Sequence, residues 1–287
     1  MSGTPNLDLP LEDRFRFGRN WRDFLASLTP ERIRAAEESL TTHLGPLKGK
    51  RFLDVGSGSG LFSLAARNLG AEVTSFDYDP DSVACANFLR ERFHPQDGGW
   101  RVFQGSALDA PMLAGLDVFD VVYSWGVLHH TGDMWTALGN VLPLVRGGGR
   151  LFISIYNDQG GKSLRWRAFK RLFIRSPRVL QLLAAAVHIL YWEARLFLIR
   201  LVRGRNPFVN PLAGGRERGM DLWHDTLDWL GGYPFEVAKP EAIFDFCSAR
   251  GFVLERLATC GGGHGCNEYV FVKGAAQADP TPRRGQA

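Results

Sequence analysis

The sequence predicts an α/β fold, a doubly wound, Rossmann-like sheet of seven strands with a helical insertion after the fifth strand. Three observations lead to this prediction. Short apolar runs alternate with segments of helical periodicity, a pattern typical of parallel sheets with helices on both faces. A glycine-rich stretch, GSGSG at 56–60, joins the first apolar run to the first helical segment. The 287 residues, 45% of them hydrophobic, are enough to bury a sizeable core.

Each expected strand is a short run rich in β-branched, aromatic and other apolar residues. The seven runs are 51–55, 72–78, 100–105, 119–125, 150–156, 252–259 and 267–273. Three glycines at 147–149 predict a turn immediately before the fifth strand. After Asn157 the alternation stops, and the chain is expected to be helical as far as Tyr233.

The expected helices of the core lie between these runs, and residues that begin and end helices mark their ends. These helices are 61–69, 79–93, 133–145 and 240–251. Asp79 can cap the second of them, with Pro80 in its first turn. Gly70 follows the first helix and ends it.

This pattern divides the chain into five parts. We expect an N-terminal helical lid at 1–48, a ligand-binding core at 49–159 and a helical insertion at 160–238. The last helix and two strands, at 239–273, complete the core. The polar tail at 274–287 is expected to be disordered.

Cysteine usage and the N-terminus indicate the compartment. The four cysteines stand singly, without the spacing of a disulfide framework or of a zinc knuckle. Residues 1–18 include acids and lack the apolar segment of a signal peptide. We therefore expect a reduced, cytoplasmic protein.

The glycine-rich stretch is typical of a cofactor-binding turn. In an open α/β sheet, ligands bind at the carboxyl ends of the strands, where the first strand meets its helix. Glycines at 56, 58 and 60 allow a tight turn and close approach of a ligand to the backbone. Asp77 ends the second strand, where a carboxylate can accept both ribose hydroxyls of an adenosine, and Tyr78 can pack on the purine.

These motifs together resemble the class I S-adenosylmethionine-dependent methyltransferases. FLDVGSGSG resembles the first motif of that family and VTSFDYDP the second, while QGSALD resembles the third-strand region that lines adenine. FDVVYSWGVLHH and LVRGGGRLFIS resemble its fourth and fifth strands. The similarity covers about residues 48–157. It implies S-adenosyl-L-methionine as the cofactor.

The resemblance also implies a set of cofactor-binding residues. Three glycines would face the methionine moiety, Asp77 would hold the ribose, and Tyr78 and Ala107 would flank the adenine. Many relatives have an acid at the position of Ser106, so this chain departs from the pattern there. The full expected set is Asp54, Gly56, Ser57, Gly58, Gly60, Asp77, Tyr78, Ser106, Ala107, Ser124 and Trp125.

The acceptor of the methyl group is suggested by SWGVLHH, which resembles small-molecule methyltransferases, among them the O-methyltransferases of quinone biosynthesis. A small, lipophilic acceptor methylated at oxygen is therefore expected. His129 and His130 are candidate bases, because a histidine near its ordinary pKa suits a phenol or an enol. Alternatively, one of them caps a helix or packs under the cofactor, and proximity alone drives transfer.

Three further segments are candidate walls of the acceptor site. The glycine-rich loop at 259–268 should lie on the cofactor edge, and there His264 and Glu268 are candidate catalytic groups. Cys260, His264 and Cys266 have no standard zinc spacing, so no metal is expected. The segment 220–236, with Trp223, His224, Asp225, Trp229 and Tyr233, is a candidate substrate lid, and the segment 17–24 is a candidate for the opposite wall.

The insertion carries a strong positive charge. Residues 162–205 hold eleven Lys or Arg and one acid, Glu193, although the whole chain has a net charge of only +4. The uncharged apolar stretch 179–192 is shorter than the roughly 20 residues that span a bilayer. Peripheral binding to the inner, anionic face of the membrane is one expectation, and a homodimer formed through 179–202 is another.

Two other functions stay open at this point. The basic insertion could serve an RNA or other macromolecule methyltransferase, although its apolar content exceeds what phosphate contacts need and nucleic acid is not favoured. A protein that binds the cofactor without catalysing transfer is the other alternative, and the intact glycine stretch with Asp77 disfavours it.

Overall fold

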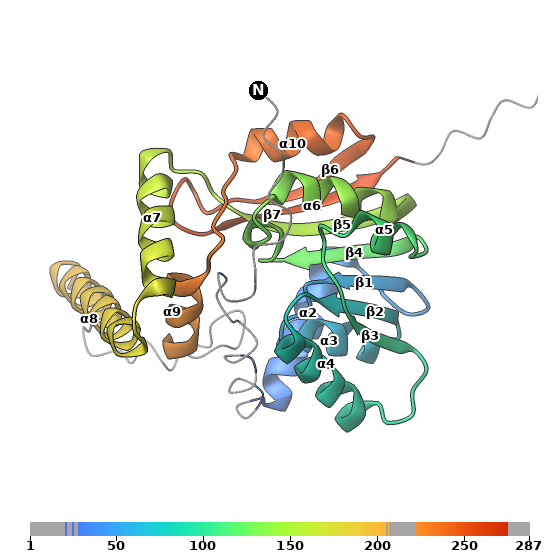
Figure 1. The fold of residues 1–287 in the computed structure, drawn as a ribbon, viewed down its shortest axis with the longest axis horizontal. Helices are drawn as coiled ribbons and strands as arrows, with labels where there is room; N and C mark the ends of the chain where they lie inside the picture. Colours follow the sequence, from blue (N-terminus) through green and yellow to red (C-terminus); the bar gives the residue numbers. More distant parts are fainter. Residues whose placement is uncertain (1–20, 22–24, 26–27, 205, 207–221, 275–287) are drawn as a thin grey trace, which may run out of the picture.

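The computed structural model describes residues 21, 25, 28–204, 206 and 222–274 (Figure 1). A seven-stranded sheet in the order β3-β2-β1-β4-β5-β7-β6 forms the centre of the described part. Its strands are β1 (Arg51–Val55), β2 (Glu72–Asp77), β3 (Trp100–Gln104), β4 (Phe119–Trp125), β5 (Val145–Tyr156), β6 (Phe252–Ala258) and β7 (Cys266–Lys273). Strands β1 to β5 run parallel, and β7 lies antiparallel between β5 and β6. The predicted doubly wound fold is confirmed.

Helices cover both faces of this sheet. The described helices of the core are α2 (Pro30–Leu44), α3 (Leu61–Asn68), α4 (Pro80–Phe93), α5 (Ala110–Ala114), α6 (Met134–Val141) and α10 (Pro240–Ser248). Residues of α2, α3 and α4 form an apolar core on one face of the sheet, and residues of α5, α6 and α10 form another on the opposite face, with β1, β2, β4, β5 and β7 contributing side chains to both. Because parallel strands are buried on both faces, their sequences are almost continuously apolar.

Two predicted elements differ from the structure. Strand β5 starts at Val145, so the glycines at 147–149 lie within the strand and not in a turn before it. The register between β4 and β5 shifts there, because Phe119 pairs with Val145 while Val121 pairs with Arg150. This bulge accommodates the glycines. The helix predicted at 133–145 ends at Val141, and the short turn Leu142–Leu144 follows it.

Helix α2 belongs to the core, although its residues fall within the N-terminal lid expected at 1–48. Ile33, Ala36, Leu40 and Leu44 are buried along one face of α2, in the same core as residues of α3. Residues 274–287 were expected to form a disordered tail, and 275–287 lie outside the described residues.

The insertion after β5 is helical, as predicted. It contains α7 (Gly161–Arg175), α8 (Arg178–Val202) and α9 (Leu222–Gly231), which stand together at one side of the sheet (Figure 1). A separate small apolar cluster of Phe173, Ala185, Leu227 and Leu230 joins these three helices. The insertion therefore packs as a unit beside the carboxyl ends of the strands.

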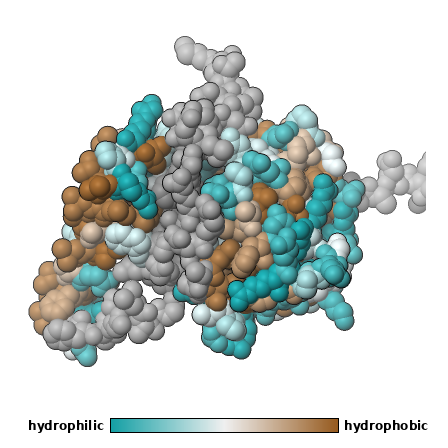
Figure 2. Space-filling model, turned by 60° about the horizontal axis from the view of Figure 1, so that its bottom comes forward, coloured by the Kyte–Doolittle hydropathy of each residue, from teal (hydrophilic) through white to brown (hydrophobic). Residues whose placement is uncertain are grey.

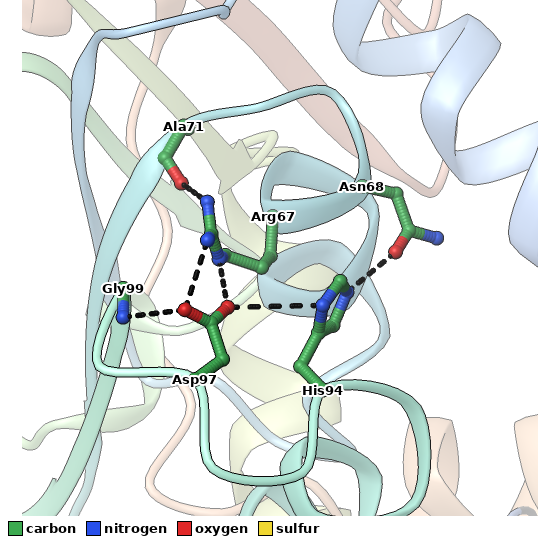
Figure 3. A network of polar contacts seen from close by, with 6 residues as sticks. All are labelled: Arg67, Asn68, Ala71, His94, Asp97 and Gly99. Atoms are coloured by element: carbon green, nitrogen blue, oxygen red, sulfur yellow. Dashed lines mark hydrogen bonds and ion pairs between the residues drawn. The ribbon is translucent and has the colours of Figure 1, made fainter.

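A polar network connects the end of α3 to the loop between α4 and β3 (Figure 3). The guanidinium of Arg67 pairs with both carboxylate oxygens of Asp97 and also donates to the carbonyl of Ala71 at 2.9 Å. Asp97 accepts from the backbone N of Gly99 at 2.8 Å. Hydrogen bonds from Arg67 and Gly99 lower the pKa of Asp97 to about 2. None of these groups lines the cavity described below, so we assign the network to stability.

Candidate active site

One cavity, of about 460 Å³, opens at the carboxyl ends of β1, β2 and β4. This volume falls within the usual range for a small-molecule or cofactor site, about 300–1,000 Å³. One half of its lining comes from the turn after β1 and the end of β2. The other half comes from the end of β5, from α9 and from the loop between β6 and β7. Two ligands can therefore meet in a single space.

The turn between β1 and α3 is crowded at two of its glycines. Gly56 has φ +78°, and a Cβ there would lie 2.3 Å from Cγ1 of Val127. Gly58 has φ +54°, and its Cβ would lie 3.1 Å from the indole of Trp21. Both glycines line the cavity, as does Trp21 from the segment expected to form its wall. The turn thus presents bare backbone to the cavity.

Gly60 has a different role from the expected one. It does not line the cavity, and a Cβ at this position would lie 2.8 Å from Cα of Ala86 on α4. With φ +80°, Gly60 also adopts a left-handed conformation directly before α3. The packing of α3 against α4 therefore requires this glycine, and the expected contact with the cofactor is not supported.

The carboxylate of Asp77 holds the glycine turn in place. Its Oδ2 accepts a 2.9 Å hydrogen bond from the backbone N of Gly58, and its Oδ1 accepts one of 2.9 Å from Asp79. Burial raises the pKa of Asp77 to about 6, against the lowering effect of these hydrogen bonds. The group lines the cavity and is ionised at neutral pH.

Asp54, the second acid at this edge, is 2% exposed. Its Oδ2 accepts a 2.5 Å hydrogen bond from the hydroxyl of Ser63 on α3. Burial raises the pKa of Asp54 to about 7. Asp54 lines the cavity together with Ser57, Tyr78, Ser106 and Ala107. The structure thus brings together nine of the eleven expected cofactor-binding residues.

Ser124, like Gly60, is an expected cofactor-binding residue that does not line the cavity. It is fully buried and absent from the cavity lining, because its Oγ donates a 3.0 Å hydrogen bond to the carbonyl of Val55 and so connects β4 to β1. Its neighbour Trp125 does line the cavity.

Glu268, an expected catalytic group, also lies outside the lining. Its Oε1 accepts a 2.8 Å hydrogen bond from Nε1 of Trp125, and its Oε2 lies 3.8 Å from Nε2 of His43. Glu268 therefore positions Trp125 and does not face the cavity, since β7 places it behind this indole.

Both candidate histidines of the turn Leu128–His130 line the cavity. His129 is fully buried, and its Nδ1 accepts from the backbone N of Tyr156 over 3.4 Å. Nδ1 of His130 donates to the carbonyl of Pro234 at 2.6 Å. Burial, together with the charge of Lys170, lowers the pKa of His130 to about 3. The pKa of His130 thus lies below its ordinary range, the ring is neutral at physiological pH, and its role as a base stays a prediction.

The glycine-rich loop between β6 and β7 reaches the cavity, as predicted. His264 and Cys266 line the cavity. Hydrogen bonds from two side-chain amides hold the loop in place. Asn267 Nδ2 donates to Oδ1 of Asn157 at 3.1 Å, and Asn157 Nδ2 donates to the carbonyl of Gly263 at 3.3 Å. Among the described residues, no group of three or more His, Cys, Asp or Glu is arranged to hold a metal ion.

Aromatic rings line the end of the cavity opposite the glycine turn. Tyr156, Trp229 and Tyr233 contribute side chains there, and the His264 ring lies 6.0 Å from that of Trp229, nearly perpendicular to it. Trp229 and Tyr233 were expected, whereas Tyr156 was missed even though it ends the fifth strand. Trp223 is 37% exposed and does not line the cavity. The side chains of His224 and Asp225 lie outside the described part of the structure.

The glycine half of the cavity fits the cofactor that the sequence motifs imply. Gly56 and Gly58 line the cavity with bare backbone, which allows a ligand to approach the main chain of the turn closely. An ionised carboxylate, Asp77, stands at the end of the neighbouring strand, where hydroxyl groups of a ribose need acceptors. Tyr78 and Ala107 offer apolar surfaces for a flat base.

Comparison with known proteins identifies the family. A family described as a methyltransferase domain matches residues 14–195. A ubiquinone biosynthesis O-methyltransferase from Aeromonas salmonicida is 30% identical over 165 residues, which are 55% of this chain and 66% of that protein. One of the same name from Xylella fastidiosa is 34% identical over 113 residues, covering 39% of this chain and 44% of that protein. The chain thus spans 44% to 66% of the length of these curated relatives.

Solved structures share the fold at low sequence identity. The [4+2]-cyclase SpnF superimposes with a TM-score of 0.52 at 12% identity, covering 84% of this chain and 80% of that one. An O-methyltransferase family protein from Burkholderia thailandensis gives 0.51 at 14% identity, covering 85% and 58%. The chain therefore belongs to the methyltransferase domain family and has the class I fold, whose cofactor is S-adenosylmethionine.

Proposed function

We propose that this protein transfers the methyl group of S-adenosylmethionine to an oxygen atom of a small, flat, lipophilic acceptor. The observation that carries the proposal is the single cavity with two unlike halves, a glycine turn with Asp77 at one end and aromatic rings at the other. The curated relatives support an oxygen acceptor, because they are named as O-methyltransferases.

In the first half, this chain's residues bind and orient the cofactor, which supplies an electrophilic methyl group on a sulfonium when it is bound. The backbone of Gly56 to Gly58 would hold its methionine moiety, and Asp77 would accept the ribose hydroxyls. Tyr78 and Ala107 would enclose the adenine. Fixing the donor in this way contributes to rate by restricting the geometry of the displacement.

In the second half, Trp125, Tyr156, Trp229 and Tyr233 would enclose a flat apolar acceptor and exclude water. His130 can accept a proton only weakly, because burial depresses its pKa to about 3. The acceptor should therefore have an acidic hydroxyl, such as that of a phenol, and proximity would supply most of the acceleration.

We further propose that helix α8 lies on an anionic membrane surface at the inner face of the membrane, from which a lipophilic acceptor enters. Exposed apolar residues form a stripe along α8, most of them three, four or seven positions apart; they are Leu180, Leu183, Val187, Leu190, Tyr191, Leu198 and Leu201. Leu190, for example, is 70% exposed. Apolar residues gather on this side of the molecule (Figure 2). Exposed arginines on the preceding helix α7, among them Arg165, Arg171 and Arg175, would suit anionic lipid headgroups.

The length of α8 corrects the sequence argument against a membrane span. The helix has 25 residues, and among the described helices it alone is long and apolar enough to cross a membrane by length and composition. We favour an interfacial position because α8 packs on α9, where His188 stacks on Trp229 with 5.3 Å between ring centroids. Glu193, Arg195 and Arg200 also lie in its second half.

A panel of acceptors tests the proposed reaction. Tritium-labelled methyl donor is incubated with the protein and with catechols, hydroquinones, aliphatic alcohols, amines or RNA. Transfer to the phenolic acceptors, and weak or no transfer to the others, supports the proposal. Transfer to RNA would contradict it and favour the macromolecule alternative, while donor binding without transfer to any class would favour a non-catalytic role.

A further inference from the structure

Lys170 on α7 is a buried cation beside the acceptor half of the cavity. Its side chain is 0% exposed. Among the described residues it is the only lysine or arginine that is buried. A buried ammonium is costly unless nearby groups compensate its charge.

The surroundings of Lys170 suit a retained positive charge. Its Nζ donates to the backbone carbonyl of Trp229 in the last turn of α9, where the helix dipole is negative. Nζ also lies 4.7 Å from the ring centroid of Trp229, 5.0 Å from that of Phe235 and 5.9 Å from that of Tyr156. Aromatic faces attract a cation at these distances.

The same rings separate Lys170 from the cavity. Tyr156 and Trp229 contact the ammonium and also line the cavity, so one layer of side chains lies between the cation and a bound acceptor. The effect of Lys170 on the lining is visible at His130, whose pKa its charge helps to lower. In a buried environment a charge acts over several ångströms with little screening.

We propose that Lys170 makes the acceptor half of the cavity an oxyanion subsite, which selects acceptors that bind and react as a phenolate or a similar ionised oxygen. This inference rests on the proposed function and names its substrate class. Lys170 is a positioning residue, because it acts through Tyr156 and Trp229 without lining the cavity. The acceptor proton leaves to solvent, the oxyanion's electron pair forms the new carbon–oxygen bond, and the pair of the broken carbon–sulfur bond stays on sulfur.

Other titratable groups around Lys170 come from each neighbouring element. They are Tyr156 of β5, His130 of the turn after β4 and His188 of α8, whose pKa is lowered by burial and by the charges of His264 and Lys170. Glu236 faces the same turn and accepts from the backbone N of Gly132 and Met134. The side chains of Asp225 and Asp228 on α9 lie outside the described part. The experiment below therefore measures the net field of all these groups.

A chromogenic phenol reports the subsite without any turnover. Bound 4-nitrocatechol is titrated by absorbance with wild-type protein and with the variants K170M, K170Q and K170R, and R171M changes an exposed cation on the same helix as the control. We expect wild-type, K170R and R171M to lower the apparent pKa of the bound dye by about one unit relative to free dye, and K170M and K170Q to abolish most of this shift.

Two results would overturn the subsite. The first is the same apparent pKa of the bound dye in wild-type protein and in folded K170M or K170Q. The second is that wild-type protein binds the dye only as the neutral phenol, or does not bind it. Circular dichroism identifies the folded variants, and the long apolar side chain in K170M matches lysine closely in shape. Labelled-methyl transfer is measured separately. Dye ionisation without transfer to any oxygen acceptor would refute the proposed function and keep the subsite. Transfer at the same rate in wild-type and in the Lys170 variants, with no difference in dye ionisation, would refute the subsite and keep the proposed function.

Discussion

Trp125 and Glu268 connect the fourth strand to the seventh through a 2.8 Å hydrogen bond from the indole Nε1 to the carboxylate Oε1. The indole lines the cavity and the carboxylate does not. The bond therefore fixes the orientation of one wall, between the glycine turn and the aromatic end of the cavity. Loss of Glu268 should loosen this wall without removing a group that touches the ligands.

The variant Glu268→Leu tests this positioning role. A hydrogen bond to a charged group contributes about 1.5–3 kcal/mol, so we expect KM for the acceptor to rise roughly tenfold or more with a smaller change in kcat. Glu268→Gln retains an acceptor oxygen and should recover most of the affinity. Steady-state kinetics measures both. A collapse of kcat at unchanged KM in the leucine variant would instead indicate a direct catalytic role.

Asp77→Ala should weaken binding of S-adenosylmethionine by about 1.5–3 kcal/mol, because two ribose hydroxyls lose a charged acceptor. Isothermal titration calorimetry at pH 8 measures the change, and Glu91→Gln on the exposed side of α4 is the control. The wild-type affinity should also fall as the pH drops below about 6, where Asp77 takes up a proton. An unchanged affinity in a folded Asp77 variant would contradict the assignment of the ribose site.

Asp54 should make the protein less stable as the pH rises. Burial raises its pKa from 3.8 to about 7, so between these values the folded state binds a proton that the unfolded chain releases. Its contribution to stability is complete below about pH 4 and is lost as the pH rises through 7. Urea unfolding at pH 5 and pH 8 should show a smaller difference in the free energy of unfolding for Asp54→Asn than for wild-type. The same difference in both proteins would contradict this pKa.

Flotation with liposomes tests the membrane proposal for α8. Vesicles of phosphatidylglycerol should bind the protein, neutral phosphatidylcholine vesicles should not, and binding should fall as salt rises. The double variant Leu183→Glu, Leu190→Glu and the charge reversal Arg165→Glu, Arg171→Glu should each abolish binding in folded protein. Lys170 is left unchanged because it is buried. A dimer that dissociates in the leucine variant would identify α8 as a subunit interface, and resistance to alkaline carbonate extraction would indicate a membrane span.

The sequence predicted the sheet well because buried parallel strands are short and almost wholly apolar. The ends of β1 and β4 match the expected runs residue for residue. Prediction from the sequence was less accurate where one local pattern is compatible with two structures. The glycines at 147–149 could form a turn or a bulge, and only the register against β4 decides. Gly60 could face a ligand or a helix, and the proximity of Ala86 decides.

Side-chain direction was the harder part of the site to predict. Lys170 was counted among the basic residues of the insertion, yet the packing of α7 against α9 buries it. Glu268 lies in the expected strand but faces Trp125 instead of the cavity. The positions of both residues depend on contacts between segments far apart in the chain, which helical or strand periodicity alone does not reveal.

The identity of the methylated atom tests the central claim most directly. The protein is incubated with S-adenosylmethionine carrying a ¹³C-labelled methyl group and with the best phenolic acceptor, and the product is examined by long-range carbon–proton correlation NMR. The account predicts a correlation from the new methyl protons to the ring carbon that bears oxygen, and the loss of this product in Asp77→Ala at limiting donor. A methyl group attached to ring carbon or to nitrogen, or no methylated product from any small acceptor, would contradict it.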